Sequence, residues 1–291
     1  MATDAPSSDV GGAGRKPDQQ VIDPTRLSRV DPLAPIDPEI ELSVLGQLTT
    51  ASNGTFLCQR ADTAGGPQAE SFVYKPVAGE RPLWDFPDGT LAEREVAAYR
   101  LSRLAGFDVV PTTEMIEGPL GAGSLQRWVN HGDGERELVG LTLSDEVPEA
   151  VFEVMEGLDQ FDRPVTVFHL DDPLLRRLAL FDVLANNSDR KGAHVLAHRG
   201  GAGDRVFGID NGLCFHAEAK LRTVLWGWTD AELTPDEVAL VTAAMEQARE
   251  LDGLITPDEV DALVERCTQV LLDGRFPEPR EDWPSVPWPP V

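Results

Sequence analysis

The chain has 291 residues, of which 41% are hydrophobic, so it is long enough to bury a sizeable core as one large domain or as two packed lobes. Its 50 acidic and 25 basic residues give a net charge of −25, and a surface this negative repels nucleic acid and anionic membranes. Three widely spaced cysteines predict neither a disulfide framework nor a zinc site. The chain has no apolar leader and no run of the ~18 apolar residues that a membrane helix needs. We therefore expect a cytoplasmic protein without a transmembrane segment.

Both ends of the chain differ in composition from its middle. Residues 1–36 are rich in Pro, Asp, Ser and Gly with little apolar periodicity, which predicts a disordered tail. Residues 273–291 combine prolines with Trp283 and Trp288, which favours an extended tail that docks through these tryptophans or binds a protein partner. The folded body is therefore expected over residues 37–272.

The first half of the body has the pattern of a small sheet with one helix. Thr90 can cap a helix that runs from Leu91 to about Ala105 and ends at Gly106. Apolar and polar residues alternate in several short segments that are bounded by turn signals. The predicted strands are a pair within 41–57, then 71–76, about 109–116 and 123–129.

The second half of the body is richer in helices. Asp172 can cap a helix that has Pro173 at its first position, and a Thr-Pro-Asp-Glu sequence begins each of two later helices. Residues 131–168 stay unassigned, except that 151–158 is compatible with a helix. The expected later elements are helices near 234–250 and 257–272 and short strands near 194–197 and 206–209.

A β-rich half followed by an α-rich half predicts an α+β fold with two lobes and a cleft between them. The expected lobes are residues 37–130 and 131–272.

The strongest functional signal lies in two short segments near residue 200. Asp189 follows the end of a predicted helix, and Asp210 ends a predicted strand. Phosphoryl transfer from ATP uses one carboxylate to orient and deprotonate an acceptor hydroxyl, and a second to hold the metal that bridges the phosphates. We therefore predict Asp189 as a catalytic residue and Asp210, together with His194, as ligands of Mg²⁺ or Mn²⁺. Lys191 can neutralise charge that develops on the transferred group.

Residues earlier in the chain fit the ATP side of such a site. Lys75 lies on a predicted strand, where kinases place a lysine that contacts phosphates, and either Glu93 or Glu95 can pair with it. Taken singly, each of these residues has an ordinary explanation, and their order along the chain is what favours an ATP site. A turn whose backbone N–H groups can cover phosphates is formed by Ser52, Asn53, Gly54 and Thr55.

At these residues the chain resembles the phosphatidylinositol 3- and 4-kinase superfamily, most closely the type II phosphatidylinositol 4-kinases. Residues 208–215, Gly-Ile-Asp-Asn-Gly-Leu-Cys-Phe, resemble its metal-binding motif, residues 72–76 its lysine strand and residues 52–55 its phosphate loop. The chain is also similar to an actinobacterial group of kinase-like proteins of unknown substrate. The resemblance implies a bilobal protein-kinase-like fold, and a kinase that uses ATP and pairs Glu95 with Lys75. It further implies that the strands leading to the adenine hinge supply Gln126, Trp128 and Val129.

Two departures from the family pattern leave alternatives open. His194 stands where the family usually has Asn, and imidazole suits manganese or zinc better than magnesium. Lys191 stands where the family usually has His. A lysine at this position resembles the pattern of protein kinases instead. The alternatives are an active kinase for a lipid, protein or small-molecule acceptor, a nucleotide-binding pseudokinase that acts as an interaction module, and an AMP transferase. The acceptor is expected to contact a segment that contains Phe215, His216, Lys220, Arg222, Trp226 and Trp228.

Overall fold

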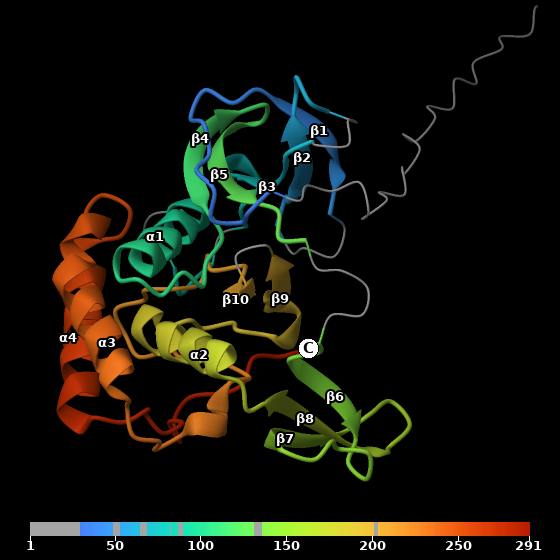
Figure 1. The fold of residues 1–291 in the computed structure, drawn as a ribbon, viewed down its shortest axis with the longest axis vertical. Helices are drawn as coiled ribbons and strands as arrows, with labels where there is room; N and C mark the ends of the chain where they lie inside the picture. Colours follow the sequence, from blue (N-terminus) through green and yellow to red (C-terminus); the bar gives the residue numbers. More distant parts are fainter. Residues whose placement is uncertain are drawn as a thin grey trace, which may run out of the picture.

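The first part of the fold is a five-stranded antiparallel sheet, shown at the top of Figure 1. The computed structural model describes residues 30–48, 53–64, 69–81, 83–86, 90–130, 136–200 and 203–291. The strand order is β1-β2-β3-β5-β4, so β3 lies at the centre of the sheet. The strands are β1 Leu42–Gln47, β2 Phe56–Arg60, β3 Ser71–Pro76, β4 Thr113–Gly118 and β5 Gly121–Arg127. These bounds confirm the predicted strands to within a few residues.

Helix α1, Leu91–Leu104, begins and ends where local signals predict. The Thr90 side chain accepts a hydrogen bond from the Glu93 backbone N–H, and the Glu93 carboxylate accepts one from the Thr90 N–H. This reciprocal cap satisfies two N–H groups that the helix itself leaves free. Gly106 follows the helix with a φ of 80°, which glycine adopts without strain.

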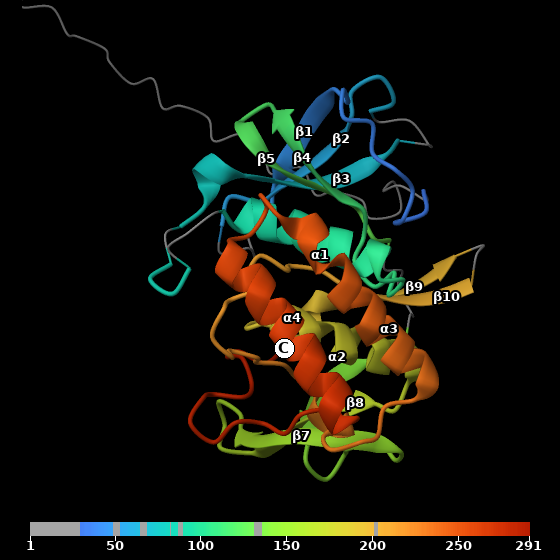
Figure 2. The same ribbon diagram turned by 90° about the vertical axis from the view of Figure 1, so that its left-hand side faces the viewer.

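Three further α-helices of the described residues form the second part of the fold (Figure 2). They are α2 Pro173–Ala185, α3 Pro235–Gln247 and α4 Pro257–Asp273, each with a proline in its first turn and a capping side chain before it. The short helix η5, Ala248–Leu251, follows α3. Helix α1 packs against β4 and β5 on one side and against α3 and η5 on the other, so it joins the sheet to the helices.

The unassigned stretch between β5 and α2 forms a second antiparallel sheet, with strand order β6-β8-β7. Its strands are β6 Val139–Leu143, β7 Val151–Leu158 and β8 Pro164–Leu170. The helix expected over 151–158 is therefore wrong. The register of β7 on β8 shifts between Glu153 and Met155, and this bulge breaks the two-residue alternation that identifies a strand in sequence.

A hairpin of β9, Val195–Gly200, and β10, Gly203–Gly208, lies between α2 and the segment that carries Asp210, as predicted. The short helix η3, Gly192–His194, precedes it, and two further short helices are η2, Val77–Gly79, and η4, Trp226–Trp228. Buried hydrophobic side chains form a large cluster around α1–α4 and a small one within the five-stranded sheet. The fold thus mixes helices with antiparallel sheets. Within the described ranges, no helix is long and apolar enough to cross a membrane.

The C-terminal segment docks on the second part of the fold. The indole N–H of Trp283 donates to the Lys220 carbonyl at 3.2 Å, and the Ser285 carbonyl accepts from the Thr223 backbone N–H at 2.9 Å. The Pro290 carbonyl accepts from the Gly192 backbone N–H at 2.8 Å, while Trp288 is 80% exposed. Docking therefore uses Trp283 and backbone groups of the tail rather than Trp288.

At the other end, residues before β1 contact the first sheet. The Arg127 side chain donates to the carbonyls of Ala34 and Pro35, and Ile36 is buried in the small cluster. Residues 1–29, which include most of the predicted disordered tail, lie outside the described residues.

The fully buried His169 makes the stability of this fold depend on pH. Its Nε2 accepts a hydrogen bond from the Gly227 backbone N–H at 2.9 Å, and its Nδ1 lies 3.0 Å from the Leu170 carbonyl, so the ring is neutral with its proton on Nδ1. Burial lowers the pKa of His169 below its usual value. The unfolded chain therefore binds more protons below about pH 6.5, and the free energy of unfolding should fall as the pH falls through this range.

The measurement is urea unfolding between pH 7 and 5 for the wild type and His169→Gln, which keeps an acceptor but does not titrate. We expect a smaller loss of stability in the variant. His194, whose pKa burial also lowers, contributes equally in both proteins. An identical loss in the two proteins would show that His169 is not the titrating group.

Candidate functional site

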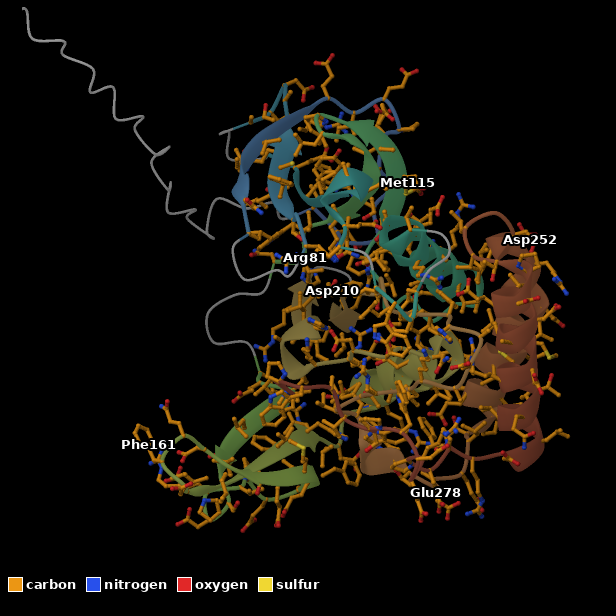
Figure 3. All side chains as sticks on the ribbon, turned by 180° about the vertical axis from the view of Figure 1, so that it is seen from behind. Arg81, Met115, Phe161, Asp210, Asp252 and Glu278 are labelled. Atoms are coloured by element: carbon orange, nitrogen blue, oxygen red, sulfur yellow. The ribbon has the colours of Figure 1, made fainter. Side chains whose placement is uncertain are left out.

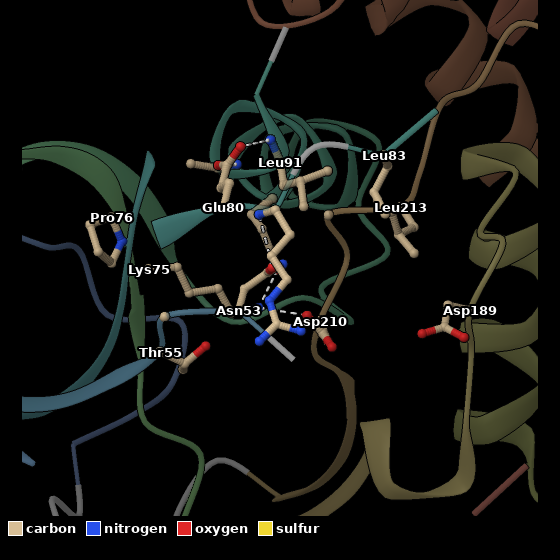
Figure 4. A pocket seen from close by; sticks show the side chains of 15 residues that line it. Asn53, Thr55, Lys75, Pro76, Glu80, Leu83, Leu91, Asp189, Asp210 and Leu213 are labelled. Atoms are coloured by element: carbon tan, nitrogen blue, oxygen red, sulfur yellow. Dashed lines mark hydrogen bonds and ion pairs between the residues drawn. The ribbon is translucent and has the colours of Figure 1, made fainter. Parts of the chain in front are cut away.

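A cavity of about 300 Å³ lies between the five-stranded sheet, the start of α1 and the segments that follow α2 and β10 (Figure 4). Its walls come from parts of the sequence that are more than a hundred residues apart. Seven of the residues that the sequence singles out line it: Asn53, Gly54, Thr55, Lys75, Glu95, Asp189 and Asp210. Ser52 lies outside the described residues.

Lys75, near the end of the central strand β3, is the cation at the centre of this cavity. Its ammonium forms ion pairs with the Glu95 carboxylate from α1 and with Asp210 Oδ1, the latter at 2.7 Å. Burial alone would lower the pKa of Lys75, but the two carboxylates outweigh it and raise the pKa above its usual value. The lysine is therefore charged at neutral pH and fixed in position.

Glu95, rather than Glu93, pairs with Lys75. Its side chain is only 2% exposed, and its second oxygen accepts the Asn211 backbone N–H at 3.0 Å. Glu93 is occupied in the cap of α1. Glu95 thus ties the lysine strand to the segment that carries Asp210.

Asp210 has a backbone φ of 58°, a left-handed conformation that Asp tolerates better than most residues. Its carboxylate is about half exposed at the cavity. The Lys75 ammonium holds the pKa of Asp210 well below its usual value, against the opposite effect of burial. Asp210 is therefore an ionised carboxylate that faces open space.

His194 lies beside Asp210, with its Nε2 3.4 Å from Asp210 Oδ2. Its other nitrogen, Nδ1, is 3.0 Å from the Asp189 carbonyl, which fixes the ring. Burial lowers the pKa of His194, so the imidazole is biased towards the neutral form that binds metals. One carboxylate and one imidazole fit a divalent cation that takes its other ligands from phosphates or water. Within the described ranges no three His, Cys, Asp or Glu side chains gather closely enough to hold a metal unaided.

Asp189 faces Asp210 from the opposite wall of the cavity in Figure 4. Its backbone N–H donates to Asn187 Oδ1 at 2.9 Å, and its carboxylate pairs with the Lys191 ammonium at 3.0 Å. Lys191 lies beside the cavity but is not part of its lining. The loop thus presents one carboxylate and one cation side by side, at a distance from the Lys75 cluster.

The loop of Asp189 is held by Arg190, whose role the sequence reading missed. This fully buried arginine makes two hydrogen bonds to Asp182 on α2, at 2.8 and 2.9 Å. It also donates to Asn211 Oδ1 and to the Ile209 carbonyl, both at 2.7 Å. Arg190 therefore fixes the Asp189 loop to the Asp210 segment. The signal in the sequence is Asp182 itself, because a lone carboxylate within an apolar helix requires a buried partner.

Glu80 is a second cavity residue that the sequence did not identify. Its carboxylate accepts the backbone N–H groups of Leu91 at 3.0 Å and Ala92 at 2.9 Å, at the start of α1. A helix N-terminus attracts anions, and here a side chain occupies that position. Close beside it, the Gly54 N–H donates to the Gly79 carbonyl at 3.1 Å, which holds Gly54 at the wall of the cavity.

The three residues predicted to contact adenine do not line this cavity. Gln126 is buried, and its amide donates to Thr113 Oγ1 at 3.0 Å. The backbone N–H of Trp128 donates to the Ser71 carbonyl, and Val129 is buried. Their role in nucleotide binding stays a prediction.

The segment expected to contact the acceptor divides between core and surface. Phe215 and Trp228 belong to the hydrophobic core and are therefore unavailable to an acceptor. His216 and Trp226 are partly buried, and the indole N–H of Trp226 donates to the Ser285 carbonyl of the tail.

Lys220 and Arg222 carry the positive charge of this segment. The Lys220 ammonium lies 5.3 Å from the centre of the Trp84 ring and 5.6 Å from that of Trp283. Arg222 stacks on Trp283 and donates to the Ser188 carbonyl at 2.6 Å, next to Asp189. Arg222 is thus the cation of this segment that lies beside the Asp189 loop.

Comparison with known proteins identifies the family of the chain but not its reaction. No family model matches. Protein Rv2133c of Mycobacterium tuberculosis is 43% identical over 263 residues, which cover 86% of this chain and 92% of that protein. The chain belongs to the family of Rv2133c. That name describes no activity, so membership of the Rv2133c family does not assign a chemical step.

Two solved structures are also similar to this member of the Rv2133c family. Hydra Fam20 with sugar matches 81% of the chain and 85% of its own length, at 15% identity and a TM-score of 0.46. The Helicobacter pylori proinflammatory kinase CtkA matches 81% of the chain and 93% of its own length, at 11% identity and a TM-score of 0.39. With TM-scores below 0.5, neither likeness establishes a fold or an activity for this chain.

Proposed function

We propose that the protein is an ATP-dependent phosphotransferase that acts on an alcohol group. The observation that carries this proposal is the cavity in which Lys75 pairs with Glu95 and Asp210 while Asp189 faces them from the other wall. A lysine fixed by a helix carboxylate, a strand-end carboxylate and a loop carboxylate are the parts that phosphoryl transfer uses. The same arrangement supports a bilobal, protein-kinase-like organisation with the nucleotide between the sheet and the helices.

The charge of the cavity argues that a polyphosphate enters it together with metal ions. Its lining contains four carboxylates and two cations, namely Glu80, Glu95, Asp189, Asp210, Lys75 and Arg81. A nucleotide triphosphate alone would be repelled by this excess of negative charge. When bound, Mg²⁺ or Mn²⁺ supplies the positive charge that screens the phosphate oxygens, and Asp210 and His194 are the residues that would hold it.

Each residue of the site has a role that follows from its position. Lys75 binds phosphate oxygens, and Asn53, Gly54 and Thr55 form the cavity wall beside the phosphates. The Gly54 N–H is already bonded to the Gly79 carbonyl, so this wall shapes the site rather than donating from that group. Asp189 accepts the proton of the acceptor hydroxyl. The hydroxyl oxygen then bonds to the γ-phosphorus of ATP as the bond to ADP breaks and ADP leaves. Lys191 keeps Asp189 oriented and offsets negative charge on the transferred group. Gln126, Trp128 and Val129 are proposed to contact adenine.

At a finer level, we propose a relation to phosphatidylinositol 3- and 4-kinase-like enzymes. It is supported by the Gly-Ile-Asp-Asn-Gly sequence around Asp210, in which Asn211 joins the Arg190 network. The acceptor class stays open among lipids, proteins and small molecules.

Thermal unfolding with and without ATP tests the nucleotide site. In the presence of Mg²⁺ or Mn²⁺, ATP at 100 times its dissociation constant should stabilise the wild type by about 2.7 kcal/mol. Asp210→Asn removes the negative charge but keeps a residue that tolerates a positive φ, and it should abolish the metal-dependent part of this shift.

Asp204→Asn, an exposed change on β10, is the matched control and should keep the full shift. No stabilisation of the wild type by millimolar ATP with either metal would overturn the proposal.

A further inference from the structure

A second cavity, of about 250 Å³, lies at the far end of the helical part of the fold. It is bounded by the last turns of α2 and α4, the segment 219–226 and the first residues of the C-terminal tail. Glu278, which lines it, lies well below Asp210 in Figure 3, so this cavity is separate from the candidate nucleotide site.

Arg266, on α4, lines this cavity, and no described residue forms an ion pair with it. Its Nε donates to the Leu184 carbonyl at 3.0 Å and its Nη1 to the His216 carbonyl at 3.3 Å. In the part of the chain that the structure describes, its Nη2 is shielded from solvent and has no hydrogen-bond partner. Burial lowers the pKa of Arg266 to about 10, because desolvation disfavours the charged form.

A partly buried cation with an Nη2 atom shielded from solvent is costly unless an anion accompanies it. Water can satisfy an N–H group, but it does not neutralise the charge. Guanidinium groups form their strongest hydrogen bonds, often two in parallel, with carboxylate or phosphate oxygens. Arg266 therefore has the environment of an arginine whose anionic partner comes from outside the chain.

The other arginines of this cavity already have such partners. Arg275 pairs with Asp230 at 3.2 Å and Glu232 at 2.9 Å, and Arg280 pairs with Asp282 at 2.6 Å. The lining also includes the carboxylates of Asp273 and Glu278, which are exposed to solvent. Because the other arginines are paired and the carboxylates repel anions, Arg266 is the most favourable position in this cavity for an anion.

Apart from the amides of Asn186 and Gln269, the remaining wall of the cavity is mostly apolar. It is built from Val183, Leu221, Trp226, Val270 and Pro277. A cavity of this size is slightly smaller than the ~300–1,000 Å³ typical of ligand pockets, and such pockets combine an apolar lining with a few polar groups. The volume and the lining of the cavity therefore suit a short alkyl chain or a single ring that carries one acid group.

We propose that this cavity binds a small amphipathic organic anion, whose acid group pairs with Arg266 and whose apolar body packs against Leu221, Trp226 and Val270. The acid group is a carboxylate or a phosphate, since both match the guanidinium.

Isothermal titration calorimetry on the full chain tests this site, with octanoate and octyl phosphate as the charged probes and octanamide as the neutral probe. At least one charged probe should bind saturably, and octanamide about tenfold or more weakly, because it lacks the charge-assisted pair. Arg266→Gln should weaken the charged probe about tenfold or more for the same reason. Arg249→Gln, an exposed arginine elsewhere on the surface, is the matched control and should bind as the wild type does.

A cavity-filling change, Leu221→Trp, keeps Arg266 and should also abolish binding, so the test remains decisive if Arg266→Gln fails to fold. Asp210→Asn should bind the probe normally, which separates this site from the proposed nucleotide site. Absence of saturable binding by both charged probes, or equal binding by wild type and Leu221→Trp, would overturn the proposal.

Discussion

Replacement of Asp189 by asparagine should lower the rate of phosphoryl transfer by about 10²–10⁴-fold, because the amide cannot accept the proton of the acceptor hydroxyl. Affinity for ATP should change little, since Asp189 lies across the cavity from Lys75 and Asp210. Asparagine has the size of aspartate and leaves the Arg190 contacts in place. The measurement is the rate of ADP release and of label transfer from the γ-phosphate, alongside ATP binding by calorimetry.

One control variant and three possible outcomes decide how this result is interpreted. Asp204→Asn should leave both transfer and binding unchanged, because this carboxylate is exposed on β10. Transfer by Asp189→Asn at the wild-type rate would contradict the role given to Asp189. ATP binding by the wild type without any transfer of label, with either metal, would favour the pseudokinase. Label from the α-phosphate on an acceptor would instead identify an AMP transferase.

Asp182→Asn should destabilise the fold by about 3–5 kcal/mol, the cost typical of leaving a buried charge without its partner. Asp182 and Arg190 are both fully buried, with neither side chain exposed to solvent. Burial alone would lower the pKa of Arg190, and Asp182 raises it above its usual value. The variant therefore leaves a buried guanidinium without the carboxylate that stabilises its charge. Urea unfolding at pH 7 measures the change in the free energy of unfolding.

Asp261→Asn provides the comparison for this loss. It breaks the ion pair between Asp261, which is 63% exposed, and Arg249, which is 60% exposed. Such exposed pairs contribute about 0–1 kcal/mol to stability. A loss in Asp182→Asn as small as that in Asp261→Asn would show that the buried pair does not hold the Asp189 loop.

Elements with local signals were predictable from the sequence alone. The caps at Thr90 and Asp172 define where α1 and α2 begin, because they involve residues within a few positions of each other. The same holds for β3, where Lys75 lies near a proline that ends the strand. These local elements bring Lys75, Asp189 and Asp210 to their places.

Features that depend on distant pairing were not predictable in this way. Strand β7 was compatible with a helix because its bulge at Glu153 hides the alternation, and only its pairing with β8 makes it a strand. The contacts of Glu80 with α1 and of Arg190 with Asn211 likewise join residues that are separated in sequence. A hydrogen bond across such a separation leaves no periodic pattern in the sequence.

The docked tail has a consequence for the order in which this protein is made. Residues 283–290 leave the ribosome after every other part of the fold described here, yet the Pro290 carbonyl binds the Gly192 backbone, directly after Lys191. Thr223, in the segment beside the Asp189 loop, likewise binds Ser285. A chain still in synthesis, or one clipped near residue 280, lacks these contacts. The loop that carries Asp189 therefore gains its last supports only when translation has reached the end of this segment.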